Sequence, residues 1–150
     1  MTASRTLRIA VVGAGYVATH HLAALSRLDF VEIVGLCDSN LPAAEALAKR
    51  FRIGMVATKL AELAVTKPNV VYVLTPPSSH TALAIEAMDM GCHVLVEKPM
   101  ADSVADCETM LAKSMATGLK LGVNHSDLFD PVLMRALDAA KNGDIGEVLS

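Results

Sequence analysis

The sequence predicts an α/β fold in which helices cover both faces of a doubly wound parallel sheet. Three observations support this prediction: short runs rich in β-branched residues alternate with longer segments of helical period, the short runs are apolar throughout, and glycine, proline or asparagine separates the segments. Strands that alternate with crossover helices form right-handed βαβ units, and such units build a parallel sheet buried on both faces.

The strands of this sheet are expected at residues 7–12, 31–37, 70–74, 93–96 and 120–123. Each run is short and rich in valine, isoleucine or leucine, which is typical of parallel strands. Residues 147–150 look like the opening of one further strand, at which the sequence stops. We therefore expect a first domain over residues 1–123, followed in residues 124–150 by a connecting loop, a helix and the first strand of a truncated second domain.

The helices are expected at residues 16–28, 41–51, 58–65, 79–90, 103–116 and 131–141. Capping residues support several of these starts: Asn40, with Pro42 in the first turn, precedes the second helix, and Ser103 opens the fifth. Thr58 is expected to cap the third helix, with Glu62 one place beyond its usual position in a capping box. Glycines at positions 91, 118 and 143 mark helix ends.

Composition and charge argue against several classes of protein. Apolar residues make up 53% of the chain and charged residues 19%, which is too apolar for a disordered chain, while the apolar runs are too short for a membrane span. The net charge of −3, the low aromatic content of 3% and the lack of a basic cluster argue against a nucleic-acid partner. No signal-peptide segment, no C-x-x-C pair and no metal-ligand spacing are seen, so we expect a cytoplasmic protein with reduced thiols and no metal.

A glycine motif lies between the first predicted strand and the first helix. It reads G-x-G-x-x-A from Gly13 to Ala18, in the strand–turn–helix context of dinucleotide-binding folds. Gly13 permits the tight turn, Gly15 lets the backbone approach a pyrophosphate, and the helix N-terminus offers free N–H groups. The residues that this motif predicts to bind a cofactor are Gly13, Gly15, Tyr16 and Val17. The alternative is an ordinary glycine turn of an α/β fold.

Asp38 follows the second predicted strand. A carboxylate at this position accepts hydrogen bonds from both ribose hydroxyls of an adenosine and repels a 2′-phosphate. Ser39 and Asn40 supply no positive charge that would hold such a phosphate. The sequence thus predicts NAD as the cofactor, with NADP disfavoured. The alternative for Asp38 is a carboxylate that stabilises the N-terminus of the next helix.

The loop after the strand at residues 70–74 carries further candidates at the same edge of the sheet, where ligands bind in open α/β folds. Two prolines make this loop stiff, and we count Thr75, Pro76 and His80 as candidate cofactor-binding residues. The alternative is that this segment serves the fold alone, as a stiff loop followed by Ser79, or Ser78, as the cap of the next helix.

Glu97-Lys98-Pro99 follows the next strand, and Asn124 follows the last one. A Glu–Lys pair at the end of a buried strand is costly unless it has partners. Lys98 at this edge can donate a hydrogen bond or a proton to a substrate oxygen near a nicotinamide, so it is the candidate catalytic residue. The alternative is a surface turn held by a salt bridge.

Together these motifs resemble the Gfo/Idh/MocA family of sugar and polyol dehydrogenases, in its N-terminal NAD(P)-binding Rossmann domain. The motifs that carry the resemblance, in the order and spacing of the family, are Gly13-Ala14-Gly15, Cys37-Asp38, Thr75-Pro76-Pro77 with His80, Glu97-Lys98-Pro99, Asn124-His125 and Gly143 with Ile145-Gly146. The Glu-Lys-Pro motif is the most specific of them, and the resemblance covers the whole chain.

The resemblance implies an NAD-dependent dehydrogenase of two domains, in which this Rossmann half precedes an α/β half with an open antiparallel sheet. Such an enzyme transfers hydride to or from a sugar, a polyol or a related small molecule, and forms a homo-oligomer when full length. The resemblance also implies that Lys98 contacts the substrate or the nicotinamide ribose, that Glu97 and Asn124 lie near the nicotinamide, and that the acid–base residue belongs to the second domain. Many members carry arginine where this chain has Leu128.

Other classes of protein fit less well. The Y-x-x-x-K motif of short-chain dehydrogenases and the P-loop motif of NTPases do not occur in the sequence. A methyltransferase does not explain Glu97-Lys98-Pro99. A stand-alone NAD-binding or NAD-sensing module without catalysis stays an open alternative, because a Rossmann domain without a substrate half binds a cofactor but performs no chemistry.

Overall fold

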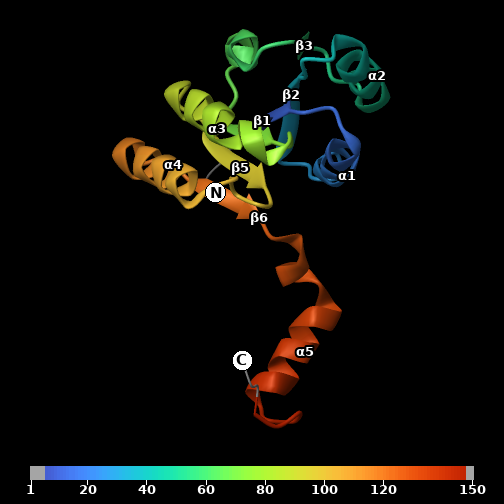
Figure 1. Ribbon diagram of the computed structural model, residues 1–150. Coiled ribbons are helices and arrows are strands. Elements are labelled where there is room, and N and C mark those ends of the chain that lie inside the picture. Colours follow the sequence, from blue (N-terminus) through green and yellow to red (C-terminus); the bar gives the residue numbers. More distant parts are fainter. Residues whose placement is uncertain (1–5, 148–150) are drawn as a thin grey trace, which may run out of the picture.

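The computed structural model describes residues 6–147. A six-stranded parallel sheet has the order β3-β2-β1-β4-β5-β6, with helices on both faces (Figure 1). The strands are β1 (Leu7–Val12), β2 (Val31–Cys37), β3 (Val56–Ala57), β4 (Val70–Val73), β5 (His93–Glu97) and β6 (Leu121–Asn124). The strand order reverses its direction between β1 and β4, which confirms the doubly wound sheet and the Rossmann fold predicted from the sequence.

The helices divide between the two faces of the sheet. On one face α1 (Tyr16–Leu25) contacts α2 (Leu41–Phe51), and on the other α3 (His80–Asp89) contacts α4 (Val104–Thr117). The remaining elements are the 3₁₀ helices η1 (Leu60–Thr66), η2 (Pro77–Ser79) and η3 (Ser126–Phe129), and the helix α5 (Pro131–Lys141).

Alternate residues of β1 enter two hydrophobic cores, as the two-residue period of a strand requires. Ile9 and Val11 face the core beneath α1 and α2, whereas Ala10 and Val12 face the core beneath α3, α4 and η1. All four side chains are buried. Since both faces are covered, the sheet is a rigid platform that presents the carboxyl ends of its strands along one edge.

The first helix is shorter than its predicted range. It ends at Leu25 rather than at residue 28. The backbone N–H groups of Arg27 and Leu28 donate to carbonyls three residues earlier, so these residues form turns that lead into β2.

The short helix predicted at residues 58–65 is the 3₁₀ helix η1, which begins at Leu60. Its N-cap position is Lys59, so the prediction that Thr58 caps it is wrong. The Glu62 carboxylate accepts a hydrogen bond from the backbone N–H of Lys59 at 3.1 Å, as the acidic residue of a capping box does. Glu62 therefore occupies its usual position in a capping box. It appeared one place too far along only because the predicted helix began too early, at residue 58.

Two predicted caps are confirmed. The side chain of Asn40 accepts from the backbone N–H of Ala43 at 3.2 Å, and Ser103 accepts from that of Asp106 at 3.1 Å. Ser79 makes no cap, because its hydroxyl lies 2.7 Å from Oγ1 of Thr75 and 2.8 Å from the carbonyl oxygen of Pro76. No pattern predicted β3, since two residues are too few to show a period.

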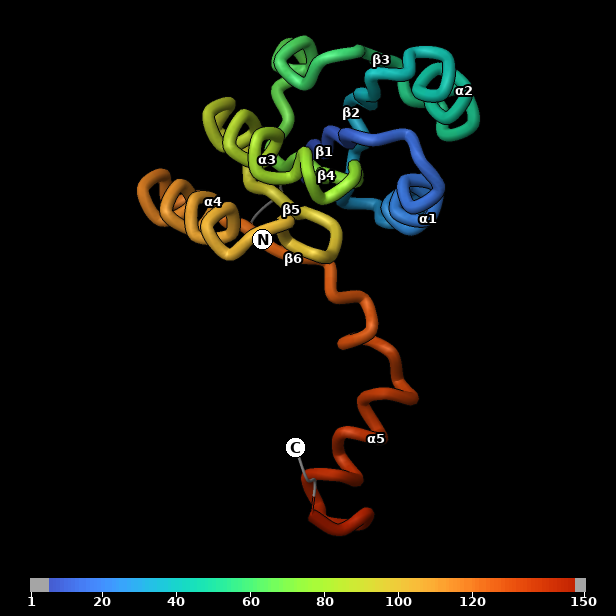
Figure 2. Tube along the Cα trace, in the orientation of Figure 1, coloured from blue at the N-terminus to red at the C-terminus, as the bar shows by residue number. Residues whose placement is uncertain are grey.

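After β6 the chain leaves the sheet, and η3 and α5 extend away from the body of the molecule (Figures 1 and 2). No residue of α5 is buried, and its apolar side chains Val132, Leu133 and Leu137 are exposed. The strand predicted at residues 147–150 lies, apart from Glu147, outside the described residues, and the domain boundary at residue 123 stays a prediction. Between residues 6 and 147, no helix is both long and apolar enough to cross a bilayer.

Candidate functional site

The glycine loop joins β1 to α1 at the carboxyl edge of the sheet. Gly13 has a φ of 103°, and a Cβ at this position would lie 2.6 Å from the carbonyl oxygen of Leu74, so glycine is needed for the loop to pass the end of β4. Gly15 differs, because its φ is −76° and a Cβ there would meet no atom within 4 Å. The space beside Gly15 is therefore open, as the approach of a phosphate to the backbone requires.

The start of α1 faces this open space. Gly15 occupies the N-cap position, and no side chain caps the first turn. The first backbone N–H groups thus keep their hydrogen-bonding capacity, and the positive end of the helix dipole favours an anion there. Tyr16 and Val17 lie in this first turn with exposed side chains. Their contact with a cofactor stays a prediction that this placement supports.

Asp38 follows β2, and its carboxylate lies across the glycine loop. Oδ2 accepts a hydrogen bond from the backbone N–H of Ala14 at 2.6 Å, and Oδ1 accepts one from that of Asn40 at 2.8 Å. These two bonds fix the orientation of the carboxylate beside the glycine loop, where its contact with a cofactor ribose stays a prediction.

A cavity of about 580 Å³ opens beside Asp38, which is a size typical of ligand sites. Its walls come from the ends of β1 and β2, the start of η1, the loop after β4 and α3. Thr75 and Pro76 line it, so the structure brings these two predicted residues together with Asp38. Leu60 and Leu83 make part of the wall apolar.

Three carboxylates act on the thiol of Cys37, which lines this cavity. Burial raises the pKa of the Cys37 thiol, and the charges of Asp38, Glu62 and Glu86 raise it further, to about 11, so the thiol is neutral near pH 7. Lys59 and Glu86 also line the cavity. Sequence reasoning missed both, because η1 and α3 reach the end of β2 only through tertiary folding, and local spacing does not show this.

His80 is buried, and its ring connects two loops. Nε2 lies 2.7 Å from the carbonyl oxygen of Thr75, and Nδ1 lies 3.1 Å from that of Pro99 and 3.3 Å from that of Met100. The ring therefore holds the loop after β4 against the turn after β5. A direct contact of His80 with a cofactor stays a prediction, and this geometry favours an indirect role through Thr75.

Glu97 and Asn124 are register partners at the ends of β5 and β6. The Asn124 amide donates a hydrogen bond to Oε1 of Glu97 at 2.6 Å, and Nε2 of His21 lies 2.7 Å from the same oxygen. The backbone N–H of Lys98 donates to Oε2 at 3.2 Å. The structure thus brings three predicted residues together and adds His21 from α1. The sequence did indicate that a carboxylate at the end of a buried strand needs partners. Residue spacing does not show that His21 is one of those partners.

The carboxyl group of Glu97 is ionised near pH 7. Its side chain is only 12% exposed. Burial tends to raise its pKa, but the hydrogen bonds from Asn124, His21 and the Lys98 N–H, together with the attraction of His21, outweigh burial and hold the pKa below the ordinary value of 4.5.

Lys98 lines a second cavity, of about 370 Å³, at the ends of β5 and β6. The turn after β5 forms one wall, and residues from His125 to Leu128 form the other. Among the described residues Lys98 forms no ion pair, whereas Glu97 of the same turn pairs with His21, so the alternative of a turn held by a salt bridge stays open. Nor does any group of three or more His, Cys, Asp and Glu side chains between residues 6 and 147 form a metal site.

A glycine loop beside an uncapped helix start, with a carboxylate held across it, is how doubly wound α/β domains bind dinucleotides, and this protein has the fold and site of that class. More narrowly, the chain belongs to the Gfo/Idh/MocA oxidoreductase family, whose model for the NAD-binding Rossmann fold matches residues 7–125. The resemblance found in the sequence motifs is thereby confirmed.

Comparisons with individual proteins agree with this family. The chain is 39% identical over 126 residues to 4-carboxy-2-hydroxymuconate-6-semialdehyde dehydrogenase of a Sphingobium species, covering 83% of this chain and 40% of that relative. It is 33% identical over 147 residues to D-glucoside 3-dehydrogenase of Escherichia coli, covering 97% of this chain and 42% of the relative. The chain therefore spans less than half the length of these curated relatives.

The fold matches solved structures of the same kind. The WlbA dehydrogenase from Bordetella pertussis, solved in complex with NADH and UDP-GlcNAcA, superposes with a TM-score of 0.87 at 27% identity. The match covers 93% of this chain and 44% of that one.

Proposed function

We propose that this chain is the NAD(H)-binding part of a dehydrogenase that transfers hydride between a nicotinamide cofactor and a sugar, a polyol or a related small hydroxy or keto compound. One observation supports this most: a single sheet edge carries both the cavity beside Asp38 and, at the end of β5, Lys98 facing a second cavity. A module that only binds NAD needs the first cavity but not a lysine at the second.

The residues present fit NAD(H). Gly15 leaves open the space that a pyrophosphate needs, and α1 offers its free N–H groups. Each oxygen of Asp38 accepts one hydrogen bond from the protein and keeps a further lone pair for a ribose hydroxyl.

The chain's own residues would place the substrate and move its proton. When bound, the nicotinamide ring supplies the hydride exchange. Nζ of Lys98 donates a hydrogen bond or a proton to the substrate oxygen, and Glu97, held by His21 and Asn124, fixes the start of the turn that carries Lys98. By this proposal the second wall of the pocket and a further acid–base residue belong to a substrate domain outside this chain.

The proposal extends to partners and location. The partner is a small sugar-like or polyol-like substrate, with no nucleic acid or membrane involved, and the full-length enzyme is a homo-oligomer in the cytoplasm. The free thiols of Cys37, Cys92 and Cys107 support a reducing compartment.

Calorimetric titration of the chain with NAD(H) and NADP(H) tests the cofactor assignment. We expect tighter binding of NAD(H), because Asp38 repels a 2′-phosphate. Equal affinity for NADP(H) would contradict the assignment. We also expect that the isolated chain does not produce NADH from a polyol. Robust NADH production would contradict the proposal that a second domain is needed.

A further inference from the structure

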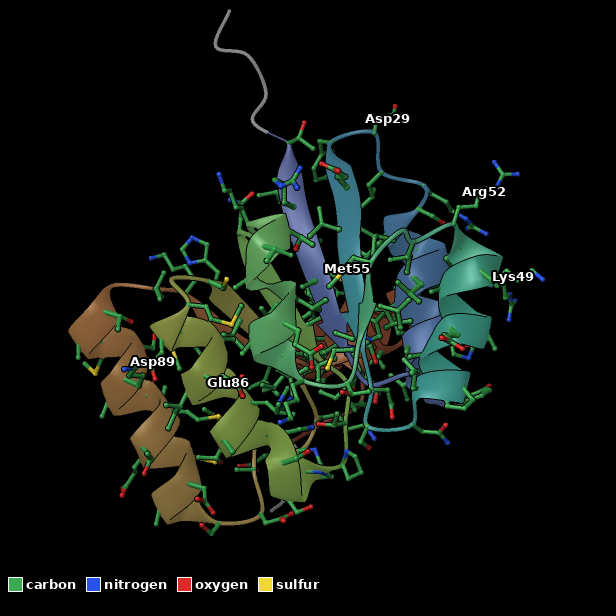
Figure 3. All side chains as sticks on the ribbon, turned by 90° about the horizontal axis from the view of Figure 1, so that it is seen from above. Asp29, Lys49, Arg52, Met55, Glu86 and Asp89 are labelled. Carbon is green, nitrogen blue, oxygen red and sulfur yellow. The ribbon has the colours of Figure 1, made fainter. Side chains whose placement is uncertain are left out.

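Glu86, on α3, presents a partly buried carboxylate to the cavity of about 580 Å³. Figure 3 shows it between α3 and η1, two elements that contact one another. Within residues 6–147 this carboxylate has no ion-pair partner, and Lys59, which lines the same cavity, does not pair with it. Asp89, one turn further along α3, does have a partner, Lys113 of α4. Glu86 thus lacks the kind of structural role that Asp89 has.

The surroundings of Glu86 make an unpaired charge costly. Leu60 of η1 and Ala82 and Leu83 of α3 line the cavity with it, so none of these neighbours offers the partly buried carboxylate a side-chain donor. Its charge also acts on Cys37, another residue of the cavity lining, as one of the causes of the raised pKa of that thiol. A hydrogen-bond donor on a bound ligand would offset this cost.

The position of that donor follows from the proposed function, on which this inference rests. In the proposed complex the phosphates lie at the glycine loop and the ribose at Asp38. The base of a nucleotide leaves the ribose on the side away from the phosphates, which here leads between η1 and α3. The apolar side chains of Leu60 and Leu83 suit the flat faces of a purine, and Glu86 lines the same cavity.

We propose that the carboxylate of Glu86 accepts a hydrogen bond from the exocyclic amino group of adenine and thereby selects adenine over a 6-oxo purine. A carboxylate only accepts hydrogen bonds. Adenine offers an amino donor at its C6 position, whereas hypoxanthine carries a carbonyl oxygen there, which is a second acceptor. The hydrogen bond to a charged acceptor is strong, and two acceptors that face one another are unfavourable. In this proposal Asp38 recognises the ribose, and Glu86 recognises the base.

Two dinucleotides that differ at this position test the proposal: NAD and nicotinamide hypoxanthine dinucleotide. In calorimetric titrations the unmutated chain should bind NAD roughly tenfold more tightly. Glu86→Gln should bring the two affinities to within about twofold, because its amide NH₂ can donate to the hypoxanthine oxygen. Glu86→Ala should weaken NAD and tighten the hypoxanthine analogue, so that the two affinities come within about twofold, because it removes both the bond to the amino group and the repulsion of the carbonyl oxygen.

The matched control is Asp89→Asn, which removes a carboxylate from the same helix away from the cavity and should keep the roughly tenfold preference. Because the readout is a ratio of two affinities, a partly destabilised variant still gives an answer. An unchanged preference in Glu86→Gln, or equal affinities in the unmutated chain, would overturn the role of Glu86 and leave the proposed function standing. If the unmutated chain binds neither dinucleotide, the proposed function falls and this inference with it.

Discussion

The two halves of the sheet edge differ in how far this chain completes them. Beside Asp38, a cavity of about 580 Å³ has walls from β1, β2, η1, α3 and the loop after β4. Beside Lys98, the cavity of about 370 Å³ has walls only from one turn and the segment around η3. Glu97 and Asn124 directly precede residues that line this second cavity. Both hydrogen-bond within one network, in which Oε1 of Glu97 contacts Asn124 and His21.

In the proposed function this difference corresponds to a division between cofactor affinity and chemistry. By the proposed function the half beside Asp38 binds the adenosine diphosphate, and the half beside Lys98 contributes the lysine and part of the substrate pocket. Substitutions in the first half should therefore change the affinity for NAD(H). Substitutions in the second should change stability or turnover and leave that affinity nearly intact.

The largest effect is expected from Gly15→Val. The branched side chain fills the space that the pyrophosphate needs, and we expect NAD affinity to fall by ~100-fold or more. The fold should be retained, because a Cβ at Gly15 meets no atom within 4 Å. Calorimetry and thermal melting check both points. Gly54→Val is the matched control, since Gly54 is equally unobstructed and lies outside the cavity. Normal NAD binding by a folded Gly15→Val chain would reduce the motif to a turn.

A smaller loss of affinity is expected from Asp38→Ala. The variant loses the acceptor for the ribose hydroxyls, so NAD should bind roughly tenfold more weakly or worse, whereas NADP loses a repulsive partner. The ratio of the two affinities, measured by calorimetry, should therefore shift toward NADP. Asp29→Ala, at an exposed aspartate before β2, is the control (Figure 3). An unchanged ratio would remove Asp38 from cofactor selection.

The hydrogen-bond network around Glu97 should contribute to the free energy of unfolding. The pKa of Glu97 is lowered on folding, so its ionised form stabilises the fold above the ordinary pKa of 4.5, and this contribution is lost as the pH falls through the lower pKa of the folded state. Glu97→Gln should lower the free energy of unfolding near pH 7 by about 1–3 kcal/mol. Below pH 4.5 the free energy of unfolding of this variant should fall less steeply with pH than that of the unmutated chain.

Urea unfolding near pH 7 and at lower pH measures this difference. Glu108→Gln, at an exposed position of α4, should behave like the unmutated chain. The same pH dependence in Glu97→Gln and in the unmutated chain would show that the network adds nothing to stability.

The smallest effect on affinity is expected from Lys98→Ala. NAD should bind to the variant chain within about twofold of the unmutated one, because Lys98 lies in the half that does not hold the adenosine. In a full-length enzyme the same change should cut turnover by ~10²-fold or more. A loss of NAD affinity as large as that of Asp38→Ala would erase the difference between the two halves. Unchanged turnover would reduce the Glu97-Lys98-Pro99 turn to a structural feature.

Features that depend on neighbours in the sequence were predicted well. Asn40 and Pro42 fixed the start of α2, and the predicted range of that helix is the observed one. The glycine motif and the strand-end carboxylate Asp38 lie together as expected, because the carboxyl ends of adjacent parallel strands meet at one edge.

Contacts between distant parts of the chain were not predictable in the same way. His21 reaches Glu97 across 76 positions, and a helical histidine gives no local sign of its partner. Glu86 resembles any polar residue of an amphipathic helix until η1 is placed against α3. Periodicity assigns a residue to a face of an element, but which element lies opposite that face is decided by the packing of the whole domain.

The buried ring of His80 has a consequence for the spacing of the two halves. One nitrogen bonds to the loop that borders the cavity beside Asp38, and the other bonds to the turn that follows Lys98. One buried imidazole therefore connects these two loops directly. The spacing between Thr75, which lines the cavity beside Asp38, and the turn that carries Lys98 is thus held by this buried side chain as well as by the pairing of β4 with β5.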